Sequence, residues 1–229
     1  MQRKRIIVLV SSAAVGAVIG ALAPSLRGRQ PRLSLFALDQ PLLEHKGLLV
    51  AAVAGWVLFS LYWEVAAHGA AEAKSSESRL SRSFHVILTN LALLMAIAPI
   101  RVLGRFLPVS VWIMALGLGV EYAGLSLAIW ARRHLGRNWS GEISIKVDHE
   151  LVRSGPYRKL RHPIYTALLT MYLGVTLVTG EGLALGGLLL AAFAYWRKIR
   201  LEEANLNAAF GSSYQAYRRE SWALVPGIF

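Results

Sequence analysis

The stretch 164–196 reads IYTALLTMYLGVTLVTGEGLALGGLLLAAFAYW, two apolar runs that are separated only by Gly180, Glu181 and Gly182. A transmembrane helix needs about 20 predominantly apolar residues. Two such runs joined by so short a turn fold back on each other as a helical hairpin. The stretch therefore predicts spans at 164–179 and 183–196 and places the chain among all-α membrane proteins.

Further apolar blocks precede this hairpin, and they lie at 6–23, 47–67, 84–100 and 109–131. The first block also fits a signal peptide with Ala21-Leu22-Ala23 as its cleavage site. Pro24 directly after that site and the length of the apolar run favour a retained span. We therefore expect about six transmembrane helices with a C-terminal cytoplasmic region.

The composition agrees with a membrane protein, because 55% of the 229 residues are hydrophobic and only 17% are charged. Soluble domains carry about 25% charged residues. The net charge of +12 is often seen in proteins that bind nucleic acid, but here the basic residues flank apolar blocks. The chain has no cysteine and its six histidines lack metal-ligand spacing, so thiol chemistry is excluded and neither a metal nor nucleic acid is expected.

The basic residues also predict the orientation in the membrane. Residues 132–161 contain eight Lys or Arg, residues 197–219 contain five more, and the hairpin tip around Gly180 contains none. Under the positive-inside rule both basic segments face the cytoplasm. Six spans then place the N-terminal Arg-Lys-Arg inside as well, whereas Arg27, Arg29 and Arg32 disagree with this orientation.

Two glutamates lie within predicted spans. Glu64 is close to a span end and can reach water, whereas Glu121 lies deeper, among the small residues of GVEYAG. Intramembrane ionisable residues suggest function, and a packed, hydrogen-bonded carboxylic acid is the equal alternative for Glu121. The polar segment 70–82 is predicted to be a loop.

Two polar clusters flank the hairpin, at 138–165 and 197–217. The first contains an extended stretch at 141–147, a turn at 154–156 and a helix start after His162. In the second, Lys198 and Glu202 share a helix face.

The second cluster should end its first helix at Phe210 and Gly211, and Ser212 or Ser213 is expected to cap the next helix. On that helix Tyr214 and Tyr217 share a face. The hairpin brings both clusters together in one cytoplasmic pocket, although a helix pair lying on the membrane surface remains an alternative.

The ordered motifs HELVRSGPYRKLRHPIYTA, KIRLEEANL, FGSSYQAY and a terminal VPG resemble the isoprenylcysteine carboxyl methyltransferase family of membrane enzymes. The resemblance covers roughly residues 138–229. It implies methyl transfer from S-adenosylmethionine to a lipophilic small-molecule or prenylated acceptor among membrane lipids. It also divides the chain into scaffold spans that can include an acceptor groove (1–131) and a methyltransferase core (132–229).

The resemblance implies roles for individual residues. The cofactor-binding residues carried over are His149, Glu150, Leu151, Val152, Tyr157, His162, Pro163, Ile164, Tyr165 and Glu202. Lys198 takes the place of a family arginine near the acceptor carboxylate, and it keeps the charge but lacks the bidentate fork.

Other interpretations of these residues stay open. His162 can cap a helix, Tyr157 and Tyr165 can be interfacial aromatics, and Lys198 can be a snorkelling anchor. Glu203 is expected to be a solvated helix residue. A nicotinamide-dependent reductase of the sterol reductase type and a non-enzymatic membrane transporter or assembly protein are the rival functions.

Overall fold

The computed structural model of the chain describes residues 42, 44–67, 78–98, 102–139 and 151–227. The elements in these segments are all helical, with two isolated bridges and no extended sheet among them. They are α3 (Lys46–Ala67), α4 (Arg79–Ile97), α5 (Val111–Leu135), η3 (Gly136–Asn138), η4 (Gly155–Arg158), α6 (Pro163–Thr179), α7 (Gly182–Phe210) and α8 (Ser212–Glu220).

The all-helical membrane fold is confirmed, and each of the last five predicted spans corresponds to a helix. Four helices, α3, α4, α5 and α7, are long and apolar enough to cross a membrane, and α6 is a shorter apolar helix of 17 residues. That length is at the lower limit for a span. The predicted span at 6–23 and the extended stretch at 141–147 lie outside the described residues.

Helix α4 begins earlier than the sequence predicts, so the expected loop at 70–82 is wrong in its last part. Ser78 caps the helix, because its side chain accepts a hydrogen bond from the Ser81 amide at 3.2 Å. The helix ends at Ile97, and Ala98 is extended. Proline disfavours the helical conformation of the residue before it, and Pro99 follows Ala98.

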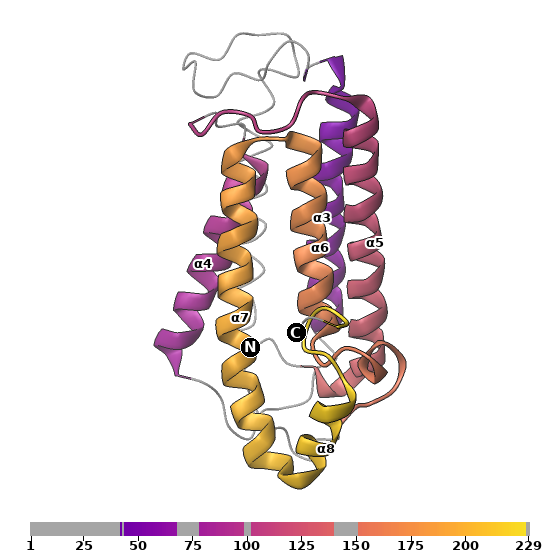
Figure 1. The fold of residues 1–229 in the computed structure, drawn as a ribbon, viewed down its shortest axis with the longest axis vertical. Helices are drawn as coiled ribbons and strands as arrows, with labels where there is room; N and C mark the ends of the chain where they lie inside the picture. The colour runs from indigo at the N-terminus through magenta and orange to yellow at the C-terminus, as the bar shows by residue number, and fades with distance from the viewer. Residues whose placement is uncertain (1–41, 43, 68–77, 99–101, 140–150, 228–229) are drawn as a thin grey trace.

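The predicted hairpin is confirmed: α6 and α7 run side by side and join at one end (Figure 1). Gly180 makes the turn possible, because it adopts a left-handed conformation with φ of 63° after the last residue of α6. Arg105, from the segment before α5, donates to the carboxylate of Glu181 at 2.9 Å. The turn therefore contains a buried ion pair at the end of the molecule away from α8.

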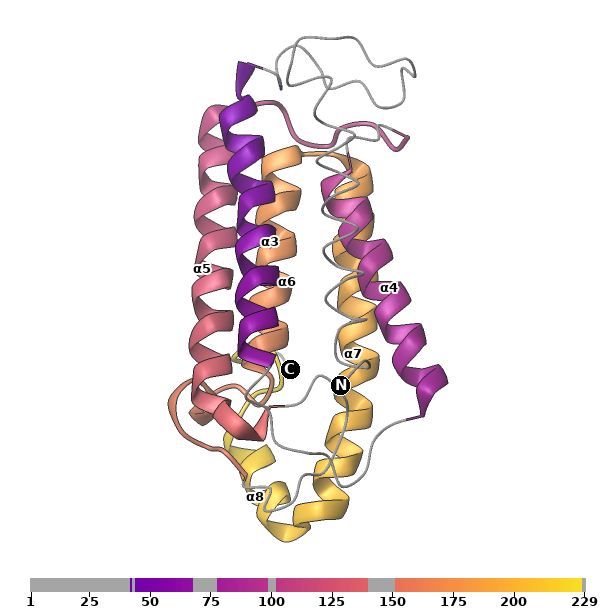
Figure 2. The same ribbon diagram turned by 180° about the vertical axis from the view of Figure 1, so that it is seen from behind.

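The other helices flank the hairpin in two groups. Figure 1 and the reverse view in Figure 2 place α3 and α5 beside α6, and α4 beside α7. Glycines let α5 approach α6 closely: a Cβ atom on Gly124 would lie 2.7 Å from the Ala167 carbonyl oxygen. Small residues at such crossings are typical of helix packing in membranes.

Glu121 of α5 is fully buried between the helices. A Cβ atom on Gly55 of α3 would lie only 2.4 Å from its carboxylate, so Gly55 makes room for this side chain. Within the described segments neither carboxylate oxygen has a hydrogen-bond partner. Glu121 is thus packed as one sequence interpretation expected, but the hydrogen bonds of that interpretation are not found there.

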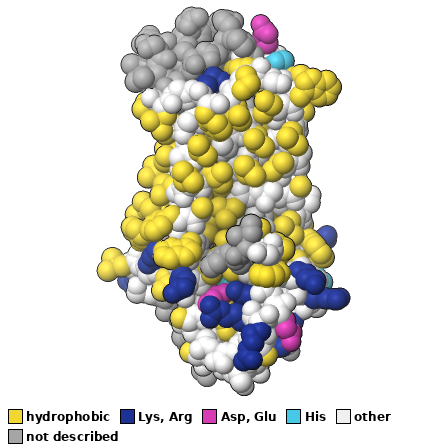
Figure 3. Space-filling model, viewed as in Figure 1, with side chains coloured by type: hydrophobic (Ala, Val, Ile, Leu, Met, Phe, Trp, Pro, Cys, Tyr) yellow, Lys and Arg dark blue, Asp and Glu magenta, His cyan; other side chains and the backbone are white. Residues whose placement is uncertain are grey.

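The outer surface separates into an apolar body and a basic end. Large hydrophobic side chains are exposed along the helices, including Trp112 at 81% and Leu189 at 63%. Figure 3 shows hydrophobic side chains over the long helical part, while Lys and Arg gather at the end that contains α8. Exposed apolar surface of this extent fits contact with lipid.

Candidate functional site

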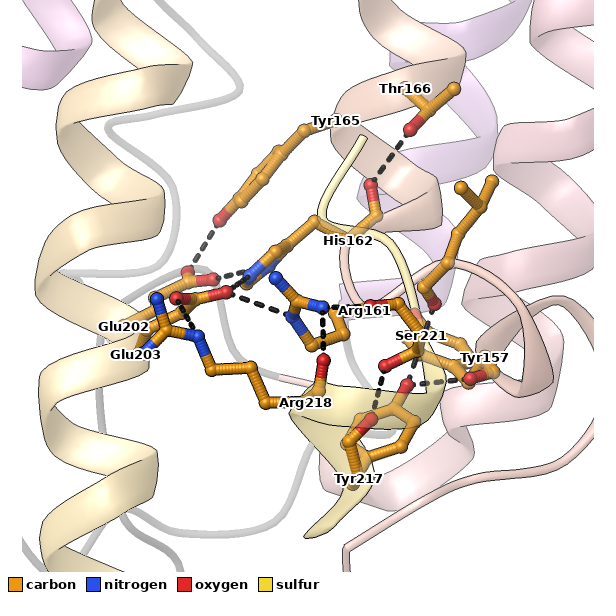
Figure 4. Close-up of polar contacts among 11 residues, drawn as sticks. Tyr157, Arg161, His162, Tyr165, Thr166, Glu202, Glu203, Tyr217, Arg218 and Ser221 are labelled. Carbon is orange, nitrogen blue, oxygen red and sulfur yellow. Dashed lines mark hydrogen bonds and ion pairs between the residues drawn. The ribbon is translucent and has the colours of Figure 1, made fainter. Parts of the chain in front are cut away.

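The two polar clusters meet at the end of the hairpin opposite its turn. Arg161 and His162 immediately precede α6, and Glu202 and Glu203 lie on α7, where that helix continues beyond its apolar part (Figure 4). The antiparallel hairpin brings these residues together although about 40 positions separate them in the sequence. The two clusters that the sequence predicted to come together are therefore in contact through polar side chains.

His162 lies between the two carboxylates and is almost fully buried. Its Nδ1 atom is 3.4 Å from an oxygen of Glu202, and its Nε2 atom is 3.5 Å from an oxygen of Glu203. Burial by itself lowers the pKa of His162, but hydrogen bonding and the charges of Glu202 and Glu203 outweigh burial and raise that pKa above its ordinary value. The geometry therefore favours a protonated His162 between two anions.

Tyr165 connects α6 with α7 on the other side of Glu202. Its hydroxyl donates a hydrogen bond to the Glu202 carboxylate. Its ring stacks on His162, with centroids 5.7 Å apart, and on Tyr195 of α7, with centroids 5.1 Å apart. Glu202 is thus held by two neighbours, and its side chain remains 21% exposed.

Arg161 and Glu203 form a second contact between the segments. The Arg161 Nε atom donates to Glu203 at 3.0 Å, and the two side chains are only 9% and 13% exposed. Arg218 of α8 also lies 3.6 Å from Glu203. The expectation of a solvated Glu203 is therefore wrong, because Arg161 from the segment before α6 and Arg218 from α8 cover its side chain.

The C-terminal tail closes over the start of α6. The Arg161 amide donates to the Trp222 carbonyl at 2.7 Å, and the His162 amide donates to the Ala223 carbonyl at 3.1 Å. The Thr166 hydroxyl donates to the Leu224 carbonyl at 2.8 Å. These bonds fix the backbone around His162 and orient its ring toward α7.

Helix α8 also contacts the segment that precedes α6. It begins at Ser212, and its cap is Gly211 with no side-chain hydrogen bond, so the predicted capping by Ser212 or Ser213 is wrong. Tyr214 and Tyr217 share the buried face, as expected. The Tyr217 hydroxyl donates to the Tyr157 carbonyl at 2.6 Å, and burial raises the Tyr217 pKa to about 12, so the phenol stays a neutral donor.

Lys198 lies one turn before Glu202 on α7 and is only 7% exposed. Its charge acts on the Glu202 carboxylate, as expected for two residues on one helix face. This burial distinguishes Lys198 from a snorkelling side chain whose ammonium group reaches water.

Most residues singled out from the sequence are gathered here. Tyr157 lies within electrostatic reach of Glu202, and Pro163, Ile164 and Tyr165 form the first turn of α6. Leu151 and Val152 are half-buried and directly precede Arg153, whose guanidinium donates to the Ser213 carbonyl. His149 and Glu150 lie outside the described residues.

Sequence reasoning assigned no role to Arg161, Tyr195 or His85, which also belong to this end of the hairpin. Arg161 lies within a recognised motif, directly before His162, and that position was the available signal. Tyr195 and His85 lie in apolar helices, where an aromatic or a lone histidine is indistinguishable from a core residue until the helix partners are known.

Comparisons with known proteins give a family match and several relatives. The model of the isoprenylcysteine carboxyl methyltransferase (ICMT) family matches residues 117–208. The chain is 37% identical over 120 residues to the cobalt-zinc-cadmium resistance protein CzcN of Cupriavidus metallidurans, a match that covers 51% of this chain and 52% of that protein. It is 32% identical over 117 residues to the protein-S-isoprenylcysteine O-methyltransferase of Schizosaccharomyces pombe, with 48% of each covered.

The chain spans about half the length of these curated relatives. Among solved structures, the eukaryotic intramembrane Ras methyltransferase ICMT aligns with 96% of this chain and 64% of that chain, with a TM-score of 0.49 and 19% identity.

Fold and site together define a multi-helix membrane protein with a histidine–carboxylate cluster at one end of a helical hairpin. Residues 117–208, which contain that hairpin and the side chains of His162, Tyr165, Lys198 and Glu202, match the model of the isoprenylcysteine carboxyl methyltransferase family.

Proposed function

We propose that this chain binds S-adenosylmethionine at the end of the α6–α7 hairpin and transfers its methyl group to a lipophilic acceptor carboxylate of the isoprenylcysteine type. One observation carries the proposal. Glu202 of α7 is held by Tyr165 of α6 and by His162, which directly precedes α6, and all three lie within the region that matches the family. The methyltransferase core proposed for residues 132–229 is built around this contact.

The chemistry of the site fits the cofactor. S-adenosylmethionine carries a sulfonium cation, and Glu202 offers an anionic side chain beside the stacked rings of Tyr165 and Tyr195. His162 is buried beside Glu202, with its Nδ1 atom 3.4 Å from a Glu202 oxygen. The residues that would hold the cofactor are His149, Glu150, Leu151, Val152, Tyr157, His162, Pro163, Ile164, Tyr165 and Glu202.

Bound S-adenosylmethionine would supply an already activated methyl group. A carboxylate acceptor is deprotonated at neutral pH, so the chain needs no strong general base and can act by alignment and exclusion of water. Lys198 would bind the acceptor carboxylate, since it is a buried cation one turn from Glu202. A lysine binds as a point charge and orients a carboxylate less strictly than a bidentate arginine does.

We place this site on the cytoplasmic side of the membrane. Support comes from the Lys and Arg side chains that gather around α8 and the loop before α6 (Figure 3). Acceptors dissolved among the membrane lipids would reach the site between the helices, and the polar cofactor would enter from the water side.

The decisive test is isothermal titration of the purified protein in lipid nanodiscs with S-adenosylhomocysteine. We expect binding by the wild type, and at least tenfold weaker binding by Glu202→Gln, because the carboxylate charge and its hydrogen bonds are altered. Glu220→Gln is the matched control, since Glu220 is an exposed glutamate of α8. No binding by the wild type, or equal binding by both variants, contradicts the proposal, and tighter binding of NADPH would indicate a reductase.

The acceptor requires a separate measurement, because some relatives are named for resistance to cobalt, zinc and cadmium. In the described segments no group of three or more His, Cys, Asp or Glu is placed to hold a metal ion. We propose a screen with labelled methyl donor over isoprenylcysteines, other isoprenoids and phospholipid amines, and expect labelling of the isoprenylcysteine carboxylate.

A further inference from the structure

His85 of α4 lies beside the site but takes no part in the cofactor cluster described above. It is only 9% exposed, and its ring meets Tyr195 edge-on, with centroids 5.7 Å apart. Tyr195 in turn stacks on Tyr165. His85 therefore lies on the α4 side of the aromatic pair Tyr165 and Tyr195, which borders Glu202.

The packing of α4 on α7 determines the position of His85. A Cβ atom on Gly187 would lie 2.6 Å from the Ala92 carbonyl oxygen, so the two helices are in close contact there. Because the helices are antiparallel, two turns from this crossing bring His85 opposite Ala194, whose backbone the ring hydrogen-bonds.

Lys198 follows Ala194 by one turn, and its charge acts on the His85 ring. His85 thus lies close to the proposed acceptor clamp.

The ring has one unused polar atom. Within the described segments the Nδ1 atom has no hydrogen-bond partner. Burial favours the neutral imidazole, which has one donor and one acceptor nitrogen. Since the hydrogen bond to the Ala194 carbonyl uses the donor, Nδ1 is left as a buried acceptor that lacks a donor. A buried acceptor without a partner is unfavourable, and a ligand N–H would remove that penalty.

We propose that His85 is a specificity-determining residue of the acceptor site, whose Nδ1 atom accepts a hydrogen bond from an amide N–H beside the carboxylate bound by Lys198. This inference rests on the proposed function and names the acceptor more closely. An N-acylated isoprenylcysteine carries its carboxylate and its amide N–H on one carbon, so neighbouring cationic and acceptor side chains suit it. His85 precedes residues 117–208, so it is a feature of this chain outside the matched region.

Two amphiphiles that differ only in the amide test this inference. N-acetyl-S-farnesylcysteine has the carboxylate and the amide N–H, whereas S-farnesylthiopropionate has the carboxylate alone. We expect the wild type in nanodiscs to bind the amide compound about fivefold more tightly, the effect of one neutral hydrogen bond. His85→Phe should lose this preference by weakening only the amide compound, and His85→Asn, which keeps an acceptor near the position of Nδ1, should restore part of it.

The outcomes separate this inference from the proposed function. Titration with S-adenosylhomocysteine and methyl transfer by the wild type test the proposed function, and both His85 variants should keep the cofactor affinity of the wild type. The ratio of the two amphiphile affinities tests His85 even if no methyl is transferred. A wild type without preference, a His85→Phe variant that weakens both amphiphiles equally, or no binding of either compound overturns the role of His85.

Discussion

The hydroxyl of Tyr165 in α6 donates a hydrogen bond to the carboxylate of Glu202 in α7, 37 residues further along the chain. This contact joins the two arms of the hairpin at the end opposite their turn. It also orients the Glu202 carboxylate, which we assign to the cofactor. The proposed cofactor binding therefore depends in part on this phenol.

Tyr165→Phe removes that hydrogen bond and keeps the ring stacking. We expect about tenfold weaker binding of S-adenosylhomocysteine by isothermal titration, since hydrogen bonds to charged groups contribute roughly 1.5–3 kcal/mol. Tyr172→Phe is the matched control on the same helix, because the Tyr172 hydroxyl donates to the Thr89 carbonyl at 3.1 Å, away from the site. Equal loss of cofactor affinity in both variants would show that the effect is structural.

The histidine between the carboxylates should make stability depend on pH. The charges and hydrogen bonds of Glu202 and Glu203 raise the His162 pKa above its ordinary 6.5, although burial opposes them. A group with a raised pKa in the folded state stabilises most below its unfolded pKa. That contribution is lost as the pH rises through the folded value.

Wild-type protein should therefore melt at a lower temperature as the pH rises above about 6.5, and His162→Gln should show less of this dependence. Thermal unfolding in detergent between pH 5.5 and 9 measures this pH dependence of the melting temperature. Parallel curves for the two proteins would contradict a raised His162 pKa.

The Arg161–Glu203 pair should contribute more to the free energy of unfolding than a surface ion pair does, because both side chains are largely buried. Arg161→Met removes the shortest ion pair of the Glu203 carboxylate and leaves it with His162 and Arg218, at 3.5 and 3.6 Å, and we expect a loss of about 3 kcal/mol in the free energy of unfolding. The double variant Arg161→Met with Glu203→Gln should recover part of that loss. If the two losses simply add in a double-mutant cycle, the pair does not contribute as a unit.

Close packing of α5 on α6 predicts opposite results for two glycines of the same helix. A Cβ atom on Gly124 would lie 2.7 Å from backbone, whereas one on Gly119 would meet nothing within 4 Å. Gly124→Ala should lower the free energy of unfolding by about 1–3 kcal/mol, the usual effect of overpacking. Gly119→Ala should be neutral or stabilising in the same detergent melting experiment, and a loss as large as that of Gly124→Ala would argue against this crossing.

A substitution of Lys198 should change the binding of the acceptor and not the binding of the cofactor. Lys198→Met removes the buried positive charge next to Glu202, so we expect at least a tenfold increase in KM for a carboxylate acceptor with little change in S-adenosylhomocysteine affinity. Lys198→Arg should keep the charge and lower KM if the guanidinium can bind the carboxylate in a bidentate manner. Steady-state methylation kinetics separate KM from kcat, and a Lys198→Met variant with unchanged KM would exclude this role.

The sequence by itself determined the helices, the hairpin and the polar residues that lie near its end. The apolar runs are long and the turn at Gly180 is short, so only one arrangement of 164–196 satisfies the backbone in a membrane. The resemblance of HPIY and EEANL to one family then predicted His162, Tyr165 and Glu202 as site residues. Local pattern and turn geometry were sufficient for the helices and the hairpin.

Only the tertiary structure decided which partners these residues have. Glu203 looks like any exposed helical glutamate in the sequence, and it is buried because Arg161, from the segment before α6, and Arg218, from α8, both contact it. His85 looks like a core histidine, and it borders the site because the contact of Gly187 with Ala92 sets the register of α4 on α7. The register between packed helices and the way the C-terminal segment folds back both depend on contacts between residues that are distant in the sequence. No local sequence pattern encodes such contacts.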